Sequence, residues 1–130
     1  MNDEKAIEQN QDTFVERGNA GDVDGVMACC SDDVVMMPPN GPVVVGAEAV
    51  RAWLAEFLEQ FTAELSTTTE DLVVEGDLAY ARRSFAWTLT PKAGGEPITD
   101  HGKTVLIYKR EAGGTWKAAL DIWNSDEPAG

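Results

Sequence analysis

Residues 50–61 read VRAWLAEFLEQF, and this stretch carries the clearest structural pattern of the chain. Its apolar residues, among them Val50, Trp53, Phe57 and Phe61, recur at intervals of three and four, which predicts a helix with one broad apolar face. Such a helix is only marginally stable by itself in water. We therefore expect its apolar face to pack against a sheet.

The residues on either side of this helix predict two further helices and a series of strands. A first helix is expected to end at Gly18–Gly21, and a second to run from Val23 to Cys30 before a turn at 31–33. Strands are expected at 34–37, 43–45, 63–75, 77–90, 97–110 and 115–124. This order predicts an α+β fold in which three N-terminal helices pack on one face of a strongly curved, mostly antiparallel sheet. Such a cone-shaped fold would enclose an internal cavity.

Composition narrows the classes of partner. The 130 residues suffice for one domain, and 23 acidic against 10 basic residues give a net charge of −13, which disfavours nucleic acid and membrane partners. No apolar run reaches the length of a membrane span, and the N-terminus lacks a secretory pattern, so we expect a cytoplasmic protein. The cysteines Cys29 and Cys30 and the single histidine His101 cannot build a zinc site, so neither a metal nor a cofactor is expected.

A series of short motifs runs through the whole chain. They are Asn19–Gly25, Ser31-Asp32-Asp33, Pro38-Pro39, Gly46–Arg51, Leu78-Ala79-Tyr80, Gly102-Lys103, Gly114–Lys117 and Asp121–Ser125. In this order the motifs resemble the nuclear transport factor 2-like superfamily, and within it the SnoaL-like and ketosteroid-isomerase-like branch. The resemblance implies a single domain over residues 1–130. It does not fix the chemistry, because the superfamily contains isomerases, dehydratases, cyclases, epoxide hydrolases and non-catalytic modules.

The resemblance also implies where an isomerase of this branch would keep its catalytic groups. The position of the general base is occupied here by Pro38, that of the oxyanion-hole tyrosine by Phe14, and that of the second oxyanion acid by Leu106 or a close neighbour. None of these side chains can accept a proton or stabilise an enolate. Steroid isomerisation by that mechanism is therefore disfavoured.

Asp121 is the strongest remaining candidate for a catalytic residue. In the last predicted strand it shares one face with Ala119 and Trp123, and the resemblance implies that this face lines the cavity. Burial beside a tryptophan would raise the pKa of the carboxyl group, which suits an acid/base role. The alternative is a structural aspartate paired with Lys103 or Arg82.

His101 is the second catalytic candidate, because the ordinary pKa of a histidine side chain lies close to neutral pH and suits proton transfer. If the last hairpin pairs Arg110 with Thr115, Thr104 lies opposite Asp121, and His101 faces away from the cavity. A shift of one residue would reverse this arrangement. A surface or dimer-interface role is the preferred interpretation of this residue.

Arg82 and Arg83 occupy the middle of an otherwise apolar strand and must point to opposite faces. One of them is therefore expected on the cavity side, where a buried arginine needs a carboxylate partner, with Asp121 as the obvious choice. This pair could bind a ligand or be purely structural.

Two functions remain open. The first is a cofactor-free isomerase, dehydratase or cyclase that acts on a hydrophobic cyclic molecule by acid/base chemistry; the second is a non-catalytic ligand-binding or dimerisation module of the same fold. The residues expected to bind the ligand are Phe14, Met37, Trp53, Phe57, Tyr80, Arg82 and Trp123. A homodimer is expected with either function, because apolar residues alternate on both faces of the strands at 77–90 and 97–110.

Overall fold

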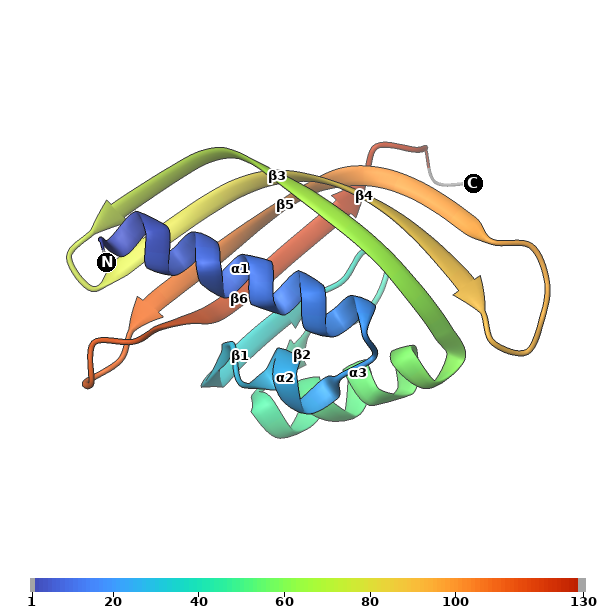
Figure 1. The fold of residues 1–130 in the computed structure, drawn as a ribbon, viewed down its shortest axis with the longest axis horizontal. Helices are drawn as coiled ribbons and strands as arrows, with labels where there is room; N and C mark the ends of the chain where they lie inside the picture. Colours follow the sequence, from blue (N-terminus) through green and yellow to red (C-terminus); the bar gives the residue numbers. More distant parts are fainter. Residues whose placement is uncertain (1, 129–130) are drawn as a thin grey trace.

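The computed structural model describes residues 2–128, with all helices in the first half of the chain and the long strands in the second (Figure 1). The helices are α1 (Asp3–Asn19), α2 (Val23–Met27) and α3 (Ala47–Gln60). The strands are β1 (Cys30–Met37), β2 (Val44–Val45), β3 (Phe61–Glu75), β4 (Leu78–Pro91), β5 (Ile98–Arg110) and β6 (Trp116–Ser125). The four long strands begin and end within two residues of the predicted positions.

The strands form one six-stranded sheet in the order β2-β1-β6-β5-β4-β3. All neighbours are antiparallel except β1 and β6, which run parallel. The sheet bends strongly, and the three helices lie against its concave side (Figure 1). The predicted α+β architecture is therefore confirmed.

The second helix and the first strand differ from the prediction. Helix α2 ends at Met27 rather than at Cys30, and Cys30 already pairs with Ala118 of β6. The polar residues 31–33, predicted as a turn, belong to β1. The strand tolerates them because its register shifts between Cys30 and Val35, and because the Ser31 hydroxyl donates a hydrogen bond to Asp33 Oδ1 at 2.8 Å.

The register of the last hairpin fixes which side chains face the helices. Arg110 pairs with Trp116 rather than with Thr115, and an irregularity between Ile107 and Tyr108 then shifts the register by one residue. Asp121 consequently pairs with Leu106. Side chains of Asp121 and Leu106 share the concave face, as do those of Thr104 and Trp123 two residues further on.

One glycine in β5 allows a close approach of two strands. An ideal Cβ atom on Gly102 would lie 2.1 Å from the carbonyl oxygen of Asn124 and 2.8 Å from the ring of Phe85. No larger residue fits this position without displacing the backbone of β6. Phe85, the β4 partner of Gly102, is thereby able to lie over the strand on the concave side.

The buried apolar residues form two clusters between the helices and the sheet. One cluster brings Ile7 of α1 against Leu106, Tyr108 and Trp116. The other joins α2, β1 and α3 and contains Met27, Cys30, Val34, Met36 and Val50. Packing of this kind, rather than intrinsic propensity, stabilises the helices on the sheet.

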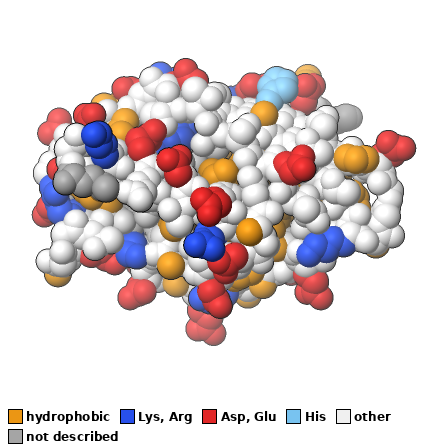
Figure 2. Space-filling view, in the orientation of Figure 1, with side chains coloured by type: hydrophobic (Ala, Val, Ile, Leu, Met, Phe, Trp, Pro, Cys, Tyr) orange, Lys and Arg blue, Asp and Glu red, His pale blue; other side chains and the backbone are white. Residues whose placement is uncertain are grey.

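Acidic side chains are spread over the face shown in Figure 2, interspersed with fewer basic ones. Seven ion pairs of lysine or arginine with a carboxylate lie within residues 2–128, and His101 makes two further contacts with carboxylates. All but one of the basic side chains in these pairs are partly or fully exposed. Exposed pairs contribute little to stability. Within the same residues, no helix combines the length and the apolar character that crossing a bilayer requires.

Candidate active site

A cavity of about 120 Å³ lies between the helices and the concave face of the sheet. Its walls come from α1, α2, α3 and every strand except β2. The residues that line it are Gln11, Phe14, Gly18, Asn19, Val26, Met36, Trp53, Leu54, Phe57, Leu58, Ala63, Leu65, Thr67, Phe85, Trp87, Thr104, Leu106, Asp121 and Trp123. The lining is mostly apolar with few polar groups, which is typical of small-molecule sites.

Asp121 is the one formally charged residue among the described residues of this lining. Its Oδ1 atom accepts a hydrogen bond of 2.7 Å from the hydroxyl of Thr104, which is itself buried. Its Oδ2 atom has no hydrogen-bond partner within residues 2–128. The carboxyl group is thus held in one orientation by Thr104 and keeps a second oxygen available to a bound molecule.

Burial raises the pKa of Asp121 from about 3.8 to about 6. The hydrogen bond from Thr104 and the positive charge of Arg83 act in the opposite direction but only partly offset the loss of hydration. A carboxyl group with this pKa exchanges its proton close to neutral pH, which is the property that general acid/base catalysis needs. The predicted upward shift for Asp121 agrees with this geometry.

Aromatic side chains form one wall of the cavity. The rings of Trp53 and Phe57 stack with centroids 5.8 Å apart, and Trp53 meets Trp123 edge to face at 5.9 Å. Phe57 also lies 6.3 Å from Trp87. The Nε1 atoms of Trp87 and Trp123 are buried without a hydrogen-bond partner in the described part of the chain. These rings therefore form one aromatic cluster in the lining that also contains Asp121.

A buried arginine lies behind the site, and its partner is not the predicted one. Arg83 is completely buried and forms an ion pair of 2.7 Å with Glu8 of α1. Its guanidinium also donates to the Tyr108 hydroxyl at 2.7 Å and to Thr69 at 3.0 Å. The expectation that one arginine enters the concave side is met by Arg83, but Glu8 rather than Asp121 neutralises it.

This network extends to the cavity wall. The hydroxyl of Tyr108 donates to Oε1 of Gln11 at 3.3 Å, and Gln11 Nε2 contacts the Thr67 hydroxyl at 3.4 Å. Burial raises the pKa of the Tyr108 hydroxyl far above its ordinary value, so this group stays protonated near neutral pH. Sequence reasoning missed Glu8 and Gln11, although a glutamine four residues after Ile7 on the apolar face of a helix signals a buried polar contact.

Five of the nine predicted site residues line the cavity, namely Phe14, Trp53, Phe57, Asp121 and Trp123. Met37 does not, because strand alternation turns its neighbour Met36 inward instead. Tyr80 and Arg82 are exposed on the convex side of β4, where the Tyr80 hydroxyl contacts Asp71 at 3.2 Å. The structure does not bring these three residues to the site.

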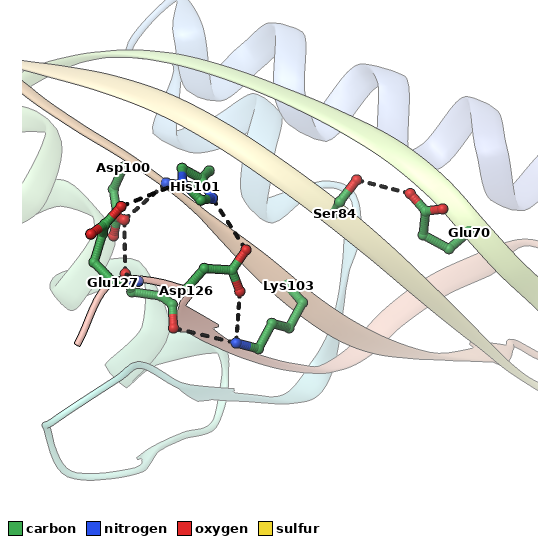
Figure 3. A network of polar contacts seen from close by, with 8 residues as sticks. Glu70, Ser84, Asp100, His101, Lys103, Asp126 and Glu127 are labelled. Carbon is green, nitrogen blue, oxygen red and sulfur yellow. Dashed lines mark hydrogen bonds and ion pairs between the residues drawn. The ribbon is translucent and has the colours of Figure 1, made fainter. Parts of the chain in front are cut away.

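His101 also lies away from the cavity, in an exposed cluster at the end of β6 (Figure 3). Its Nδ1 atom is 3.1 Å from Asp126 Oδ2, and its Nε2 atom is 3.4 Å from Glu127 Oε1. Asp126 also binds Lys103 at 2.7 Å. These contacts hold the segment after β6 against β5, and Thr104 rather than His101 is the neighbour of Asp121.

The three positions that the resemblance assigned to isomerase catalytic groups hold no side chain able to exchange a proton. Phe14 and Leu106 both line it with hydrocarbon, and Pro38 is not among its lining residues. Cys30 is also unsuited to catalysis, because burial raises the pKa of its thiol to about 12. Asp121, which accepts a hydrogen bond from Thr104, is therefore the one carboxyl group in the described lining.

The aspartates near α2 have structural roles. Asp22 caps α2 by accepting a hydrogen bond of 2.9 Å from the backbone N–H of Gly25. Asp24 forms an exposed ion pair with Arg51. Within residues 2–128, no three His, Cys, Asp or Glu side chains lie close enough together to hold a metal ion.

Three helices packed on the concave side of a curved six-stranded sheet are the arrangement of the nuclear transport factor 2-like class of folds. The chain belongs to the SnoaL-like domain family, whose model matches residues 12–119. No curated protein matches the chain.

Several solved structures share this fold. A conserved protein from Planctomyces limnophilus is 27% identical with a TM-score of 0.87, covering 95% of this chain and 97% of its own. A ketosteroid isomerase-like protein from Erwinia carotovora is 24% identical with a TM-score of 0.88, covering 98% and 100%. A protein from Novosphingobium aromaticivorans, named as a candidate scytalone dehydratase, is 13% identical with a TM-score of 0.85, covering 95% and 83%. The last two likenesses concern the fold alone.

Proposed function

We propose that the protein binds a hydrophobic cyclic molecule in this cavity and that Asp121 exchanges a proton with it. The observation that carries the proposal is a single carboxyl group with a pKa of about 6 in an otherwise apolar lining. The carboxylate would remove a proton from the bound molecule, and the resulting carboxylic acid would return it at another atom. Isomerisation, dehydration and cyclisation all use this pair of steps.

A suitable test reaction is the isomerisation of 3-cyclohexen-1-one to 2-cyclohexen-1-one. It requires one carbon-bound proton to be removed and one to be returned, and the conjugated product is followed by its ultraviolet absorbance. We expect acceleration by the protein to rise as Asp121 ionises near pH 6 and to fall by about 100-fold in Asp121→Asn.

Asp126→Asn is the matched control, because it also removes one carboxylate but lies in the exposed cluster around His101. It should leave the rate unchanged. If the wild-type rate does not exceed the rate in buffer, or if Asp121→Asn is as fast as the wild type, the catalytic part of the proposal is wrong.

The second candidate function is ligand binding without catalysis. The observation that favours it is the hydrocarbon of Phe14 and Leu106, which leaves Asp121 without an oxyanion-stabilising partner of the isomerase kind. Quenching of the fluorescence of Trp53 and Trp123 by 2-cyclohexen-1-one measures binding separately from turnover. Binding without acceleration selects this second function.

A homodimer is a further part of the proposal. Two rows of mostly apolar side chains cross the convex face of the sheet in register: Val45, Val35, Leu120, Ile107 and Tyr80, then Met37, Ile122, Val105 and Arg82. Val45, Tyr80 and Ile122 are exposed in the single chain. A continuous apolar surface that pairs with its own copy about a two-fold axis would cover these residues.

A further inference from the structure

The cavity restricts the charge of the molecule it can hold. Asp121 carries the one formal charge in the described lining, and no lysine, arginine or histidine accompanies it there. The nearest buried cation, Arg83, is already paired with Glu8 at 2.7 Å. When Asp121 is ionised, its negative charge therefore has no directly bound counter-ion. This charge repels an anion and attracts a cation.

The aromatic wall adds a second reason to expect a cation. Trp123 shares a strand face with Asp121, and Trp53 and Phe57 continue the wall from α3. The faces of tryptophan and phenylalanine rings attract ammonium groups, tryptophan most strongly. An ammonium group that binds the open Oδ2 atom of Asp121 would lie in the same lining as these rings, so both interactions favour the same ligand chemistry.

The volume of the cavity limits the size of the ligand. An engineered apolar cavity of about 150 Å³ in another protein accepts benzene. The cavity described here has about 120 Å³. This is smaller than the benzene-binding cavity, so a single six-membered ring is about the largest group that it holds, any substituent would extend towards the open side of the cavity, and a fused system of three or four rings does not fit without opening of the helices.

We propose that the ligand of the cavity is a single-ring organic cation, an amine whose ammonium group binds Asp121 while its ring packs against Trp53, Phe57 and Trp123. This inference rests on the ligand-binding part of the proposed function and agrees with its second candidate, because an ammonium group bound to Asp121 would hold the carboxylate ionised rather than let it exchange a proton. The inference specifies the charge of the ligand, which the fold alone does not determine.

Three probes of equal shape and different charge test the proposal: benzylamine, benzyl alcohol and benzoate. Binding is measured by calorimetry and by tryptophan fluorescence at about pH 7.5, where Asp121 is ionised. Benzylammonium should bind at least about tenfold more tightly than benzyl alcohol, and benzoate should not bind. Asp121→Asn should abolish the difference between the amine and the alcohol, whereas Asp126→Asn should leave it unchanged.

The pH dependence supplies an independent readout. The other titratable or charged groups around Asp121 are Arg83 and Glu8, which form an ion pair, and Tyr108 and Cys30, whose pKa values burial raises well above neutral pH. The affinity for benzylammonium should therefore fall about tenfold per pH unit below pH 6 and stay constant above it. The affinity for benzyl alcohol should not follow this profile.

Two outcomes overturn different parts of the argument. If benzyl alcohol binds as tightly as benzylammonium to the wild type, the charge preference is wrong, and the proposed function stands. If none of the three probes binds, while the protein is folded by circular dichroism, both the charge preference and the proposed ligand cavity are wrong.

Discussion

Asp121→Asn should make the protein more stable at neutral pH. At that pH the carboxyl group of Asp121 is largely ionised, although burial disfavours its charge and raises its pKa to about 6. Asparagine has almost the same shape and retains the oxygen that accepts the hydrogen bond from Thr104. Since Arg83 is paired with Glu8, the substitution leaves no buried cation without its partner.

The magnitude follows from the shift in pKa. The folded-state value of about 6 lies above the unfolded value of about 3.9, so between these limits the folded protein holds a proton that the unfolded chain has lost. The stability contributed by this proton is complete below the unfolded pKa and is lost as the pH rises through 6. A shift of two units corresponds to about 3 kcal/mol.

The assay is urea unfolding of the wild type and Asp121→Asn across this range at one protein concentration. The two proteins share every other carboxyl group, so the difference in their free energies of unfolding isolates Asp121. We expect the advantage of the variant to grow by about 2 kcal/mol between about pH 4.5 and about pH 7.5. A difference that is constant or shrinks over this range would refute the assigned environment of Asp121.

Asp126→Asn provides a control of opposite sign. Hydrogen bonds from Lys103 and His101 lower the pKa of Asp126, so its carboxylate contributes stability above the unfolded pKa that is lost as the pH falls through the folded value. The substitution should therefore lower the stability near neutral pH. The same direction of change for both substitutions would contradict the reasoning for one of them.

Three further substitutions test the fold and the assembly. Glu8→Gln removes the counter-charge of the fully buried Arg83 and should lower the free energy of unfolding by about 3 kcal/mol in urea; an unchanged value would show that the ion pair is dispensable. Gly102→Ala should lower the stability by about 1–3 kcal/mol, because its Cβ atom would lie 2.1 Å from the Asn124 carbonyl oxygen. An unchanged melting temperature would contradict this contact. Ile122→Glu should convert a dimer to a monomer in analytical ultracentrifugation with unchanged circular dichroism, and a dimeric variant would place the interface elsewhere.

The sequence predicted the elements well because their signals are local. The spacing of Val50, Trp53 and Phe57 is a helical pattern that only one face of α3 can satisfy, and that face does meet the sheet and the cavity. Period-two alternation likewise placed Asp121 and Trp123 on one face of β6. These predictions needed no knowledge of distant residues.

The errors concern which face of a strand turns inward. Alternation requires Arg82 and Arg83 to point in opposite directions, but it does not say which one meets the helices. The same ambiguity affected Met36 and Met37. The answer depends on register, and the registers of β1 and β5–β6 contain irregularities that no local pattern reports.

Partners distant in sequence were the hardest to predict. Glu8 and Arg83 are 75 positions apart, and Glu8 is one of four acidic residues that recur every four positions along one side of α1. Nothing local distinguishes it from Glu4 or Glu16. From the sequence, Asp121 was the reasonable choice as partner of the buried arginine, because it is a carboxylate in a predicted apolar strand. This prediction was wrong.

The identity of that partner decides the chemistry of the cavity. A guanidinium bound directly to Asp121 would stabilise the carboxylate and hold its pKa low, so the group would stay ionised and serve as a fixed anchor. Because Glu8 pairs with Arg83, Arg83 acts on Asp121 only by longer-range charge attraction. Burial is therefore the largest influence on the pKa of Asp121. Glu8 of α1 therefore helps to keep the pKa of Asp121 raised by pairing with Arg83, although Glu8 itself does not line the cavity.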